Sequence, residues 1–137
     1  QRIQGVLLVG ASLDPALETT YWVQWLGEVP LINWLPPKDF ISSNRELLRL
    51  EGDLRTLRNQ LGRLRTPVHM LHGTEDSLVP VENVHYFKQA LMQEGKASLL
   101  EVTIHPGVDH FIPWTHPGMI EASLQQLMTR ISEPPSR

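Results

Sequence analysis

The chain has 137 residues, of which 41% are hydrophobic and 20% charged, proportions typical of one compact domain and unlike those of a disordered chain. Twelve basic and fifteen acidic residues give a net charge of −3, which argues against nucleic acid as a partner. Cysteine is absent, which excludes a disulfide framework, a thiolate metal site and a cysteine nucleophile. With no apolar run near the roughly 18 residues of a membrane span and no recognisable signal peptide, we expect a cytoplasmic protein.

The first predicted element is a strand. Val6 to Val9 are continuously apolar between two glycines, which is typical of a parallel strand that is covered on both faces. Asp14 and Pro15 then predict the start of a helix, and its expected aromatic face holds Tyr21, Trp22, Trp25 and Leu26. Residues 29–40 contain several prolines among apolar side chains, a pattern that predicts an irregular cap lying over another part of the molecule.

A long amphipathic helix is predicted next. Leucines recur on one helical face from Ser43 or Asn44 to Leu64, with arginine and glutamate between them. Thr66-Pro67 ends this helix, because proline cannot continue it and restricts the residue before it. We interpret the arginines as a solvated face with ion pairs four residues apart, and binding of an anion or a partner is the alternative.

Strands and helices alternate in the rest of the chain. The pattern predicts strands at 68–71 and 99–104, helices at 81–94 and 117–131, and a polar tail at 133–137. Such alternation predicts the α/β class, with a parallel sheet and right-handed crossovers, and ligands beyond the carboxyl ends of the strands. Three strands are few for such a sheet, so we expect part of a larger fold, and possible self-association through an open strand edge.

The loops after the last two predicted strands hold the residues best suited to chemistry. One loop reads HGTEDSLVP from His72 and the other HPGVDHF from His105. They place an acid and a histidine at the same edge of neighbouring strands. We select Asp76 and His110, because an aspartate that accepts the Nδ1 proton turns Nε2 of a histidine toward a nucleophile. The alternatives are a turn residue and a packed loop histidine.

These segments resemble the carboxyl-terminal half of the α/β-hydrolase fold family. HGTEDSLVP is similar to the segment HG-x-x-D-x-x-VP that follows the family's seventh strand and supplies the triad acid, and GVDH is similar to the G-x-x-H segment after its eighth strand. GVLLVGASLDP looks like its sixth strand, residues 15–64 like its cap region and connecting helix, and FIPWTHPGMIEASLQQLM like its final helix. The resemblance covers nearly all of residues 1–137.

The resemblance implies a serine hydrolase that acts on an ester, thioester or amide, such as an esterase or a lipase-like enzyme. Its partner would be a small-molecule acyl substrate, Asp76 and His110 would be the acid and base of a catalytic triad, and no cofactor or metal is expected. The family's nucleophile lies in a G-x-S-x-G motif, which this sequence lacks. We therefore expect the nucleophile upstream of Gln1 and this chain alone to be inactive.

Two residues near the first strand are second choices for the triad. Ser12 lies in GASLD, the nearest approach to the nucleophile motif, although Asp14 stands in place of the second glycine. Asp14 itself is an alternative acid, because some members of the family place the acid after the sixth strand. A role as helix N-cap explains Asp14 more simply.

Further residues are candidates for a substrate pocket or a metal site. We expect pocket walls from Trp34, Leu35, Val79, Phe111 and Trp114, with packing in the core or cap as the alternative for the aromatic residues. His69 and His72 form an H-x-x-H pair, but side chains three apart on a strand point to opposite faces, which disfavours a shared metal ion. The rival function is a non-catalytic interaction module, either degenerate or completed by a partner chain, and a small unrelated α/β binding domain is a third option.

Overall fold

The structure is a computed structural model that describes residues 3–17 and 37–133. Its elements are β1 (Val6–Val9), α2 (Pro37–Gln60), β2 (Val68–Gly73), α3 (Glu82–Gln93), β3 (Leu100–His105), α4 (Ile112–Thr115) and α5 (Pro117–Ser132). Residues 15–17 begin a further helix, and single 3-10 turns lie at Leu61–Arg63 and Ala97–Leu99. The predicted aromatic helix face, the greater part of the predicted cap, Trp34 and Leu35 lie outside the described residues.

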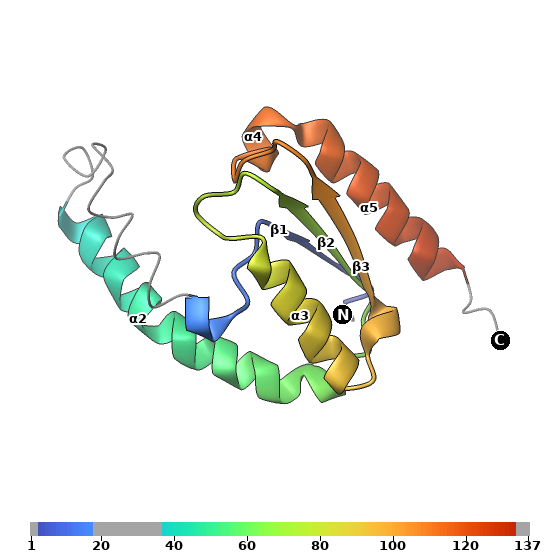
Figure 1. Cartoon of the computed structure of the whole chain (residues 1–137), viewed down its shortest axis with the longest axis horizontal. Coiled ribbons are helices and arrows are strands. Elements are labelled where there is room, and N and C mark those ends of the chain that lie inside the picture. The colour runs from blue at the N-terminus through green and yellow to red at the C-terminus, as the bar shows by residue number, and fades with distance from the viewer. Residues whose placement is uncertain (1–2, 18–36, 134–137) are drawn as a thin grey trace.

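The three strands form one parallel sheet in the order β1-β2-β3. Val68 of β2 pairs with Val6 of β1 and with Leu100 of β3, which sets the register. Each connection contains a helix, α2 between β1 and β2 and α3 between β2 and β3. α3 covers one face of the sheet and α5 the other (Figure 1). The predicted α/β fold class with a parallel sheet is confirmed.

The core has two parts because successive strand side chains point to opposite faces of the sheet. Toward α3, Val68 and Met70 of β2 pack with Phe87, Ala90 and Leu91 of the helix. Toward α5, Leu71 packs with Val108, Ile112 and partly buried residues of α5. With both faces covered, the carboxyl ends of the strands remain available for loops, which is where sheets of this kind bind ligands.

α2 begins earlier than the sequence predicts. The expected start was Ser43 or Asn44, whereas the helix runs from Pro37 to Gln60 and continues as a 3-10 turn to Arg63. The prediction of irregular structure is therefore wrong for residues 37–40. The physical reason is that proline is favoured in the first turn of a helix, where its missing N–H removes no internal hydrogen bond.

Two other elements differ from expectation at the carboxyl edge of the sheet. β2 extends through His72 and Gly73 because both pair with β3. The single turn α4 was not predicted, and its buried Ile112 packs in the core with Leu71 and Val108. Among the described residues, no helix combines the length and the apolar character needed to cross a membrane.

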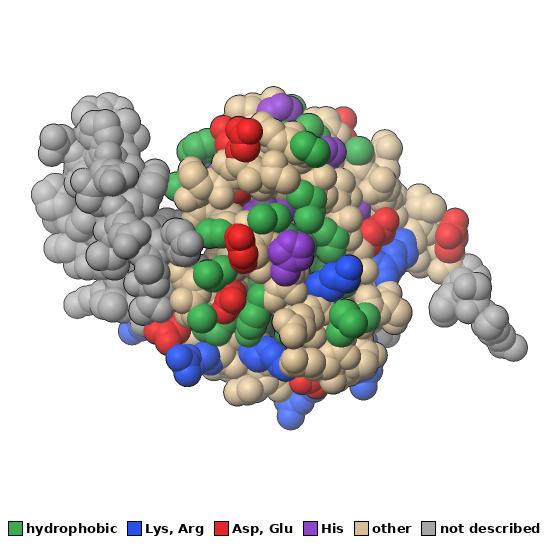
Figure 2. Space-filling view, viewed as in Figure 1, with side chains coloured by type: hydrophobic (Ala, Val, Ile, Leu, Met, Phe, Trp, Pro, Cys, Tyr) green, Lys and Arg blue, Asp and Glu red, His purple; other side chains and the backbone are tan. Residues whose placement is uncertain are grey.

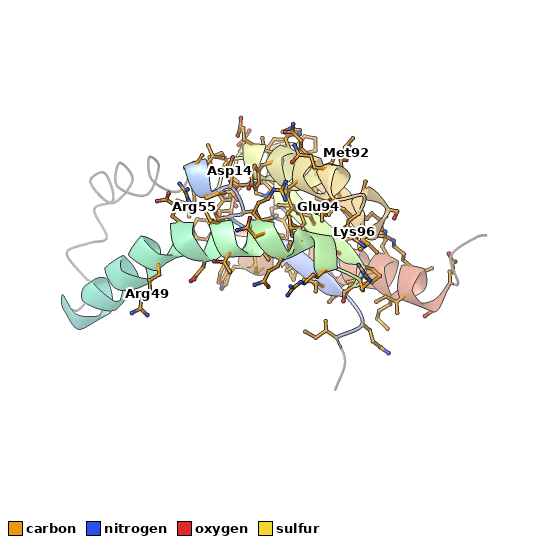
Figure 3. All side chains as sticks on the ribbon, turned by 90° about the horizontal axis from the view of Figure 1, so that it is seen from below. Asp14, Arg49, Arg55, Met92, Glu94 and Lys96 are labelled. Atoms are coloured by element: carbon orange, nitrogen blue, oxygen red, sulfur yellow. The ribbon has the colours of Figure 1, made fainter. Side chains whose placement is uncertain are left out.

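The charged face of α2 is attached to the end of α3. Arg58 Nη1 lies 2.8 Å from Glu94 Oε1, and Arg55 pairs with Glu51 one turn earlier at 2.7 Å. Figure 3 shows Glu94 beside α2, while Arg49 points away from the body of the molecule. Basic side chains also gather along the lower edge of the face in Figure 2. Such exposed pairs contribute at most about 1 kcal/mol each.

His69 is a buried polar residue in the middle of β2. Its side chain is fully buried, with Nε2 3.0 Å from Thr103 Oγ1. Nδ1 has no hydrogen-bond partner within residues 3–17 and 37–133 and lies 3.7 Å from Glu101 Oε2. Burial lowers the pKa of His69 below 6.5; the Glu101 carboxylate opposes this shift, and the Arg130 guanidinium reinforces it. The folded chain therefore favours the neutral imidazole.

This burial makes the stability of the fold dependent on pH. Because the pKa of His69 is lower in the folded than in the unfolded chain, the unfolded chain binds more protons below pH 6.5. The stabilisation is complete above that pH and is lost as the pH falls toward the folded pKa, by up to about 1.4 kcal/mol per pH unit. We predict that His69→Gln flattens this decline when urea unfolding is measured between pH 7 and pH 5, whereas His85→Gln, at an exposed position of α3, does not. Equal declines in all three proteins would contradict this account.

Candidate active site

Two loops meet at the carboxyl edge of the sheet, and they touch at Gly73. A Cβ atom at Gly73 would stand 2.0 Å from the carbonyl oxygen of Val108, so the loop after β3 can lie on the end of β2 only where a side chain is missing. The loops are joined by backbone hydrogen bonds of 3.0 Å, in which Thr74 N–H donates to His105 O and Glu75 N–H donates to Val108 O. These contacts fix the positions of the residues that follow in each loop.

The joined loops bring Asp76 and His110 together. His110 Nδ1 lies 2.8 Å from Asp76 Oδ2. The side chain of Asp76 is fully buried, whereas that of His110 is 27% exposed. The structure thus places the two residues selected from the sequence in direct hydrogen-bond contact, with the acid inside and the imidazole reaching the surface.

Backbone groups hold the carboxylate in a fixed orientation. The N–H groups of Leu78 and Val79 donate to Asp76 Oδ1 at 3.0 and 2.7 Å, and Oδ2 remains for His110. Because an ionised carboxylate only accepts hydrogen bonds, Nδ1 of His110 is the donor. The neutral imidazole therefore has its proton on Nδ1 and a lone pair on Nε2, which is the arrangement of a general base.

His72 supports the acid loop, which is the segment after β2 that carries Asp76, from within the core. It is fully buried, and its Nε2–H donates to Val79 O at 2.9 Å. The same nitrogen lies 3.6 Å from Asp76 Oδ2, and Nδ1 has no hydrogen-bond partner in the part of the chain that the structure describes. His72 therefore holds the backbone of the loop that carries Asp76.

The loop after β1 lies against the Asp76–His110 hydrogen bond. Gly10 has a φ angle of 52°, and a Cβ atom there would stand 3.1 Å from His110 Nδ1 and 3.2 Å from Asp76 Oδ2. The backbone of Gly10 thus covers the bond between the two side chains. Sequence reasoning missed this contact, and the only available signal was a glycine placed directly after an apolar strand.

The two second-choice residues occupy the same loop but do not join the pair. Ser12 Oγ is buried without a hydrogen-bond partner among the described residues, so it makes no hydrogen bond to His110. Asp14 Oδ1 accepts a hydrogen bond of 2.9 Å from Ala16 N–H. This bond is the N-cap contact expected for Asp14 at the start of a helix.

Phe111 and Trp114 form an exposed aromatic surface beside His110. The ring of Phe111 packs edge-on against both neighbours, with centroid distances of 5.9 Å to His110 and 6.0 Å to Trp114. Phe111 is 49% and Trp114 75% exposed. Val79, in contrast, is buried, and its backbone groups bind Asp76 and His72.

His69 and His72 do not share a partner. Their ring nitrogens contact Thr103 and Val79, on β3 and on the acid loop respectively. Within residues 3–17 and 37–133, no group of three or more histidine, aspartate or glutamate side chains is arranged to hold a metal ion.

A surface hollow of about 700 Å³ lies between β3 and α5. Glu101, Gln125 and Arg130 are among its lining residues. Glu101 stands at the start of β3, whereas His110 follows the end of that strand. The hollow therefore lies at the opposite end of the sheet from the Asp76–His110 pair.

Solved structures resemble this chain over nearly its whole length. An esterase from Pyrococcus furiosus superposes with a TM-score of 0.63 at 13% sequence identity, covering 97% of this chain and 46% of that one. A monoacylglycerol lipase from Paleococcus ferrophilus superposes with a TM-score of 0.54 at 20% identity, covering 96% of this chain and 60% of that one. No protein-family model matches the chain, and no curated protein matches its sequence.

These likenesses identify the fold as that of α/β-hydrolases, in agreement with the parallel sheet and its helices. The chain spans about half the length of the two structures, 46% and 60%. It therefore carries part of an α/β-hydrolase fold. At 13% and 20% identity the agreement concerns the fold alone.

The position of Gly10 generates a mutational prediction. Gly10→Ala places a methyl group against Asp76 and His110 and also strains the backbone, because φ is 52° there. Gly95→Ala is a matched control, since Gly95 has a φ of 66° but nothing within 4 Å of its would-be Cβ. Both variants should lose about 1–2 kcal/mol of stability in urea unfolding. Only Gly10→Ala should shift the NMR resonance of the His110 Nδ1 proton, and an unshifted resonance in that variant would contradict the contact.

Proposed function

We propose that this chain supplies the acid and base of a serine hydrolase that cleaves esters, thioesters or amides. The observation that carries the proposal is the 2.8 Å hydrogen bond between buried Asp76 and His110, which leaves Nε2 of His110 as a free acceptor. The likeness to an esterase and a monoacylglycerol lipase supports hydrolysis of acyl compounds as the reaction class. The imidazole is the one member of the pair that reaches the surface, as a base acting on a bound substrate must.

The proposed reaction uses His110 twice. Nε2 accepts the proton of a serine hydroxyl as its oxygen attacks the carbonyl carbon of the substrate, and the imidazolium then protonates the leaving group as the bond to the acyl carbon breaks. Water repeats the sequence on the acyl-enzyme: His110 takes its proton, the hydroxide oxygen bonds to the carbonyl carbon, and serine leaves with the returned proton. Asp76 keeps the imidazole oriented and stabilises its positive charge in both steps.

The nucleophile would come from residues outside this sequence. The 137 residues contain no G-x-S-x-G motif, and Ser12 makes no hydrogen bond to His110. In this proposal β1, β2 and β3 correspond to the sixth, seventh and eighth strands of the family, so that the chain is the carboxyl-terminal portion of one hydrolase domain. Residues 15–64 would then contain its cap and connecting helix.

The acyl part of the substrate would lie on the aromatic surface of Phe111 and Trp114. Both rings are exposed next to the base, and burying such rings against an acyl chain removes apolar area from water. Trp34 and Leu35 remain proposed walls of the same pocket, whereas the burial of Val79 suits it to holding the acid loop.

The test is an assay of two forms of the protein. The 137-residue chain alone should hydrolyse p-nitrophenyl acetate no faster than its His110→Ala variant. A protein extended upstream along the gene to include a G-x-S-x-G segment should be active, and His110→Ala or Asp76→Asn should lower its kcat by about 10,000-fold. His85→Ala, at an exposed position on α3, should leave kcat unchanged.

The outcomes separate the competing hypotheses. A His110-dependent rate in the short chain would refute the external nucleophile and point to Ser12. A gene without an upstream strand, G-x-S-x-G motif and helix would instead favour the non-catalytic interaction module. An extended protein that stays fully active as Asp76→Asn would remove Asp76 from the triad.

The edge of β1 that pairs with no strand among the described residues is the proposed site of self-association. Val6 N–H and Gly10 N–H donate to Pro67 O and Leu71 O of the chain that forms β2, each at 3.0 Å. Since N–H groups alternate in direction along a strand, those of Leu7 and Val9 point to the unpaired edge, where they can bind another strand. The apolar side chains of β1 are only partly buried, which would favour a second strand beside it.

We predict concentration-dependent dimers or larger species in sedimentation velocity. Leu7→Pro should yield monomers, because it removes an edge N–H without removing a bond to β2. Ile104→Lys, at an exposed position on the opposite edge strand, should leave association unchanged. A well-folded monomer at every concentration would rule out association through β1.

A further inference from the structure

Asn83 is a fully buried amide in the first turn of α3. Its Oδ1 accepts two hydrogen bonds of 2.8 Å, from Leu13 N–H and from Asp14 N–H. Its Nδ2 donates to Pro80 O at 3.0 Å. One side chain therefore links the loop after β1 to the loop after β2, although about 70 residues separate the first loop from Asn83 in the sequence.

Both linked loops touch the Asp76–His110 pair. The loop after β1 begins at Gly10, whose backbone covers the hydrogen bond between the two side chains. The loop after β2 carries Asp76, and Pro80 directly follows Val79, which donates to Asp76 Oδ1. The side-chain hydrogen bonds of Asn83 go to Leu13, Asp14 and Pro80 and not to Asp76 or His110, so its hydrogen bonds act on the pair through the two loops.

The bonds of Asn83 suit an amide better than any other side chain. Its carbonyl oxygen has two lone pairs for two N–H donors. Its NH2 group adds a second hydrogen bond to Pro80 O, which also accepts from the backbone N–H of Asn83 at 3.0 Å. Leu13 is itself buried in the core toward α3, so the loop has two attachments, one apolar and one polar. Without the amide, the N–H group of Leu13 would be buried and unsatisfied, which is unfavourable enough to move the loop.

We propose that Asn83 is a positioning residue for the Asp76–His110 pair, holding the loop after β1 against the hydrogen bond that orients the base. The inference rests on the proposed function, since it assigns Asn83 to the same acid and base. It predicts that removing the amide exposes the Nδ1 proton of His110 to solvent while the sheet and helices stay folded.

The test is NMR of the whole chain with 15N-labelled histidine, which reports the Nδ1 proton of His110 and its exchange with water. Asn83→Ala should accelerate this exchange by about tenfold or more, the factor that corresponds to losing roughly 1.4 kcal/mol of protection. Asn83→Asp keeps both bonds to Oδ1 but places a second acceptor oxygen against Pro80 O, so it should accelerate the exchange less than Asn83→Ala does. Asn83→Ser keeps a single hydroxyl acceptor and should give an intermediate rate; it also serves as the test if Asn83→Ala does not fold.

A second variant separates positioning from general loss of stability. Ala90→Gly weakens the same helix at a buried site that faces the core, and it should leave the exchange rate of the His110 proton unchanged. Equal acceleration in Ala90→Gly, or unchanged exchange in Asn83→Ala or Asn83→Ser, would overturn the inference. A wild-type chain without a protected His110 Nδ1 proton would overturn the proposed function itself, and the inference with it.

Discussion

The carbonyl oxygen of Val108 stands 2.0 Å from the place that a side chain on Gly73 would occupy. Only a residue without Cβ allows the loop after β3 to lie on the end of β2, and the backbone bonds between the two loops depend on that approach. Asp76 follows three residues after Gly73, and His110 two residues after Val108. The separation of the acid and the base is therefore set by backbone contacts, before either side chain is considered.

Backbone and core also determine how the two side chains face each other. The N–H groups of Leu78 and Val79 fix Asp76 Oδ1, and the buried His72 donates a hydrogen bond to the carbonyl oxygen of Val79. Oδ2 is left with His110 as its partner, while the backbone of Gly10 covers the remaining side. A general base is more effective when it is already oriented toward the proton that it accepts, because no entropy is then lost in orienting it during the reaction. The described residues thus hold an oriented imidazole without any contribution from a substrate.

The parts of the fold that follow from local patterns were predictable from the sequence. β1 matches its predicted bounds, and α3 and α5 match theirs within one residue, because each depends on its own apolar spacing. Asp76 and His110 were predictable as neighbours because parallel strands end at one edge of the sheet. Gly10 and Asn83 were not, because their contacts join residues about 66 to 100 positions apart and leave no local pattern. The start of α2 at Pro37 was not predictable, because a proline can mark either the end or the beginning of a helix.

The two outer strands differ in a way that bears on what lies beside them. β3 alternates Leu100, Val102 and Ile104 on one face with Glu101, Thr103 and His105 on the other, which is the pattern of a strand at the edge of a sheet. β1 is apolar on both faces, which is the pattern of an interior strand, although only β2 pairs with it among the described residues. An interior sequence at an open edge buries its apolar area fully only when another strand lies alongside. This asymmetry supports the proposal that further strands of the sheet lie beyond β1.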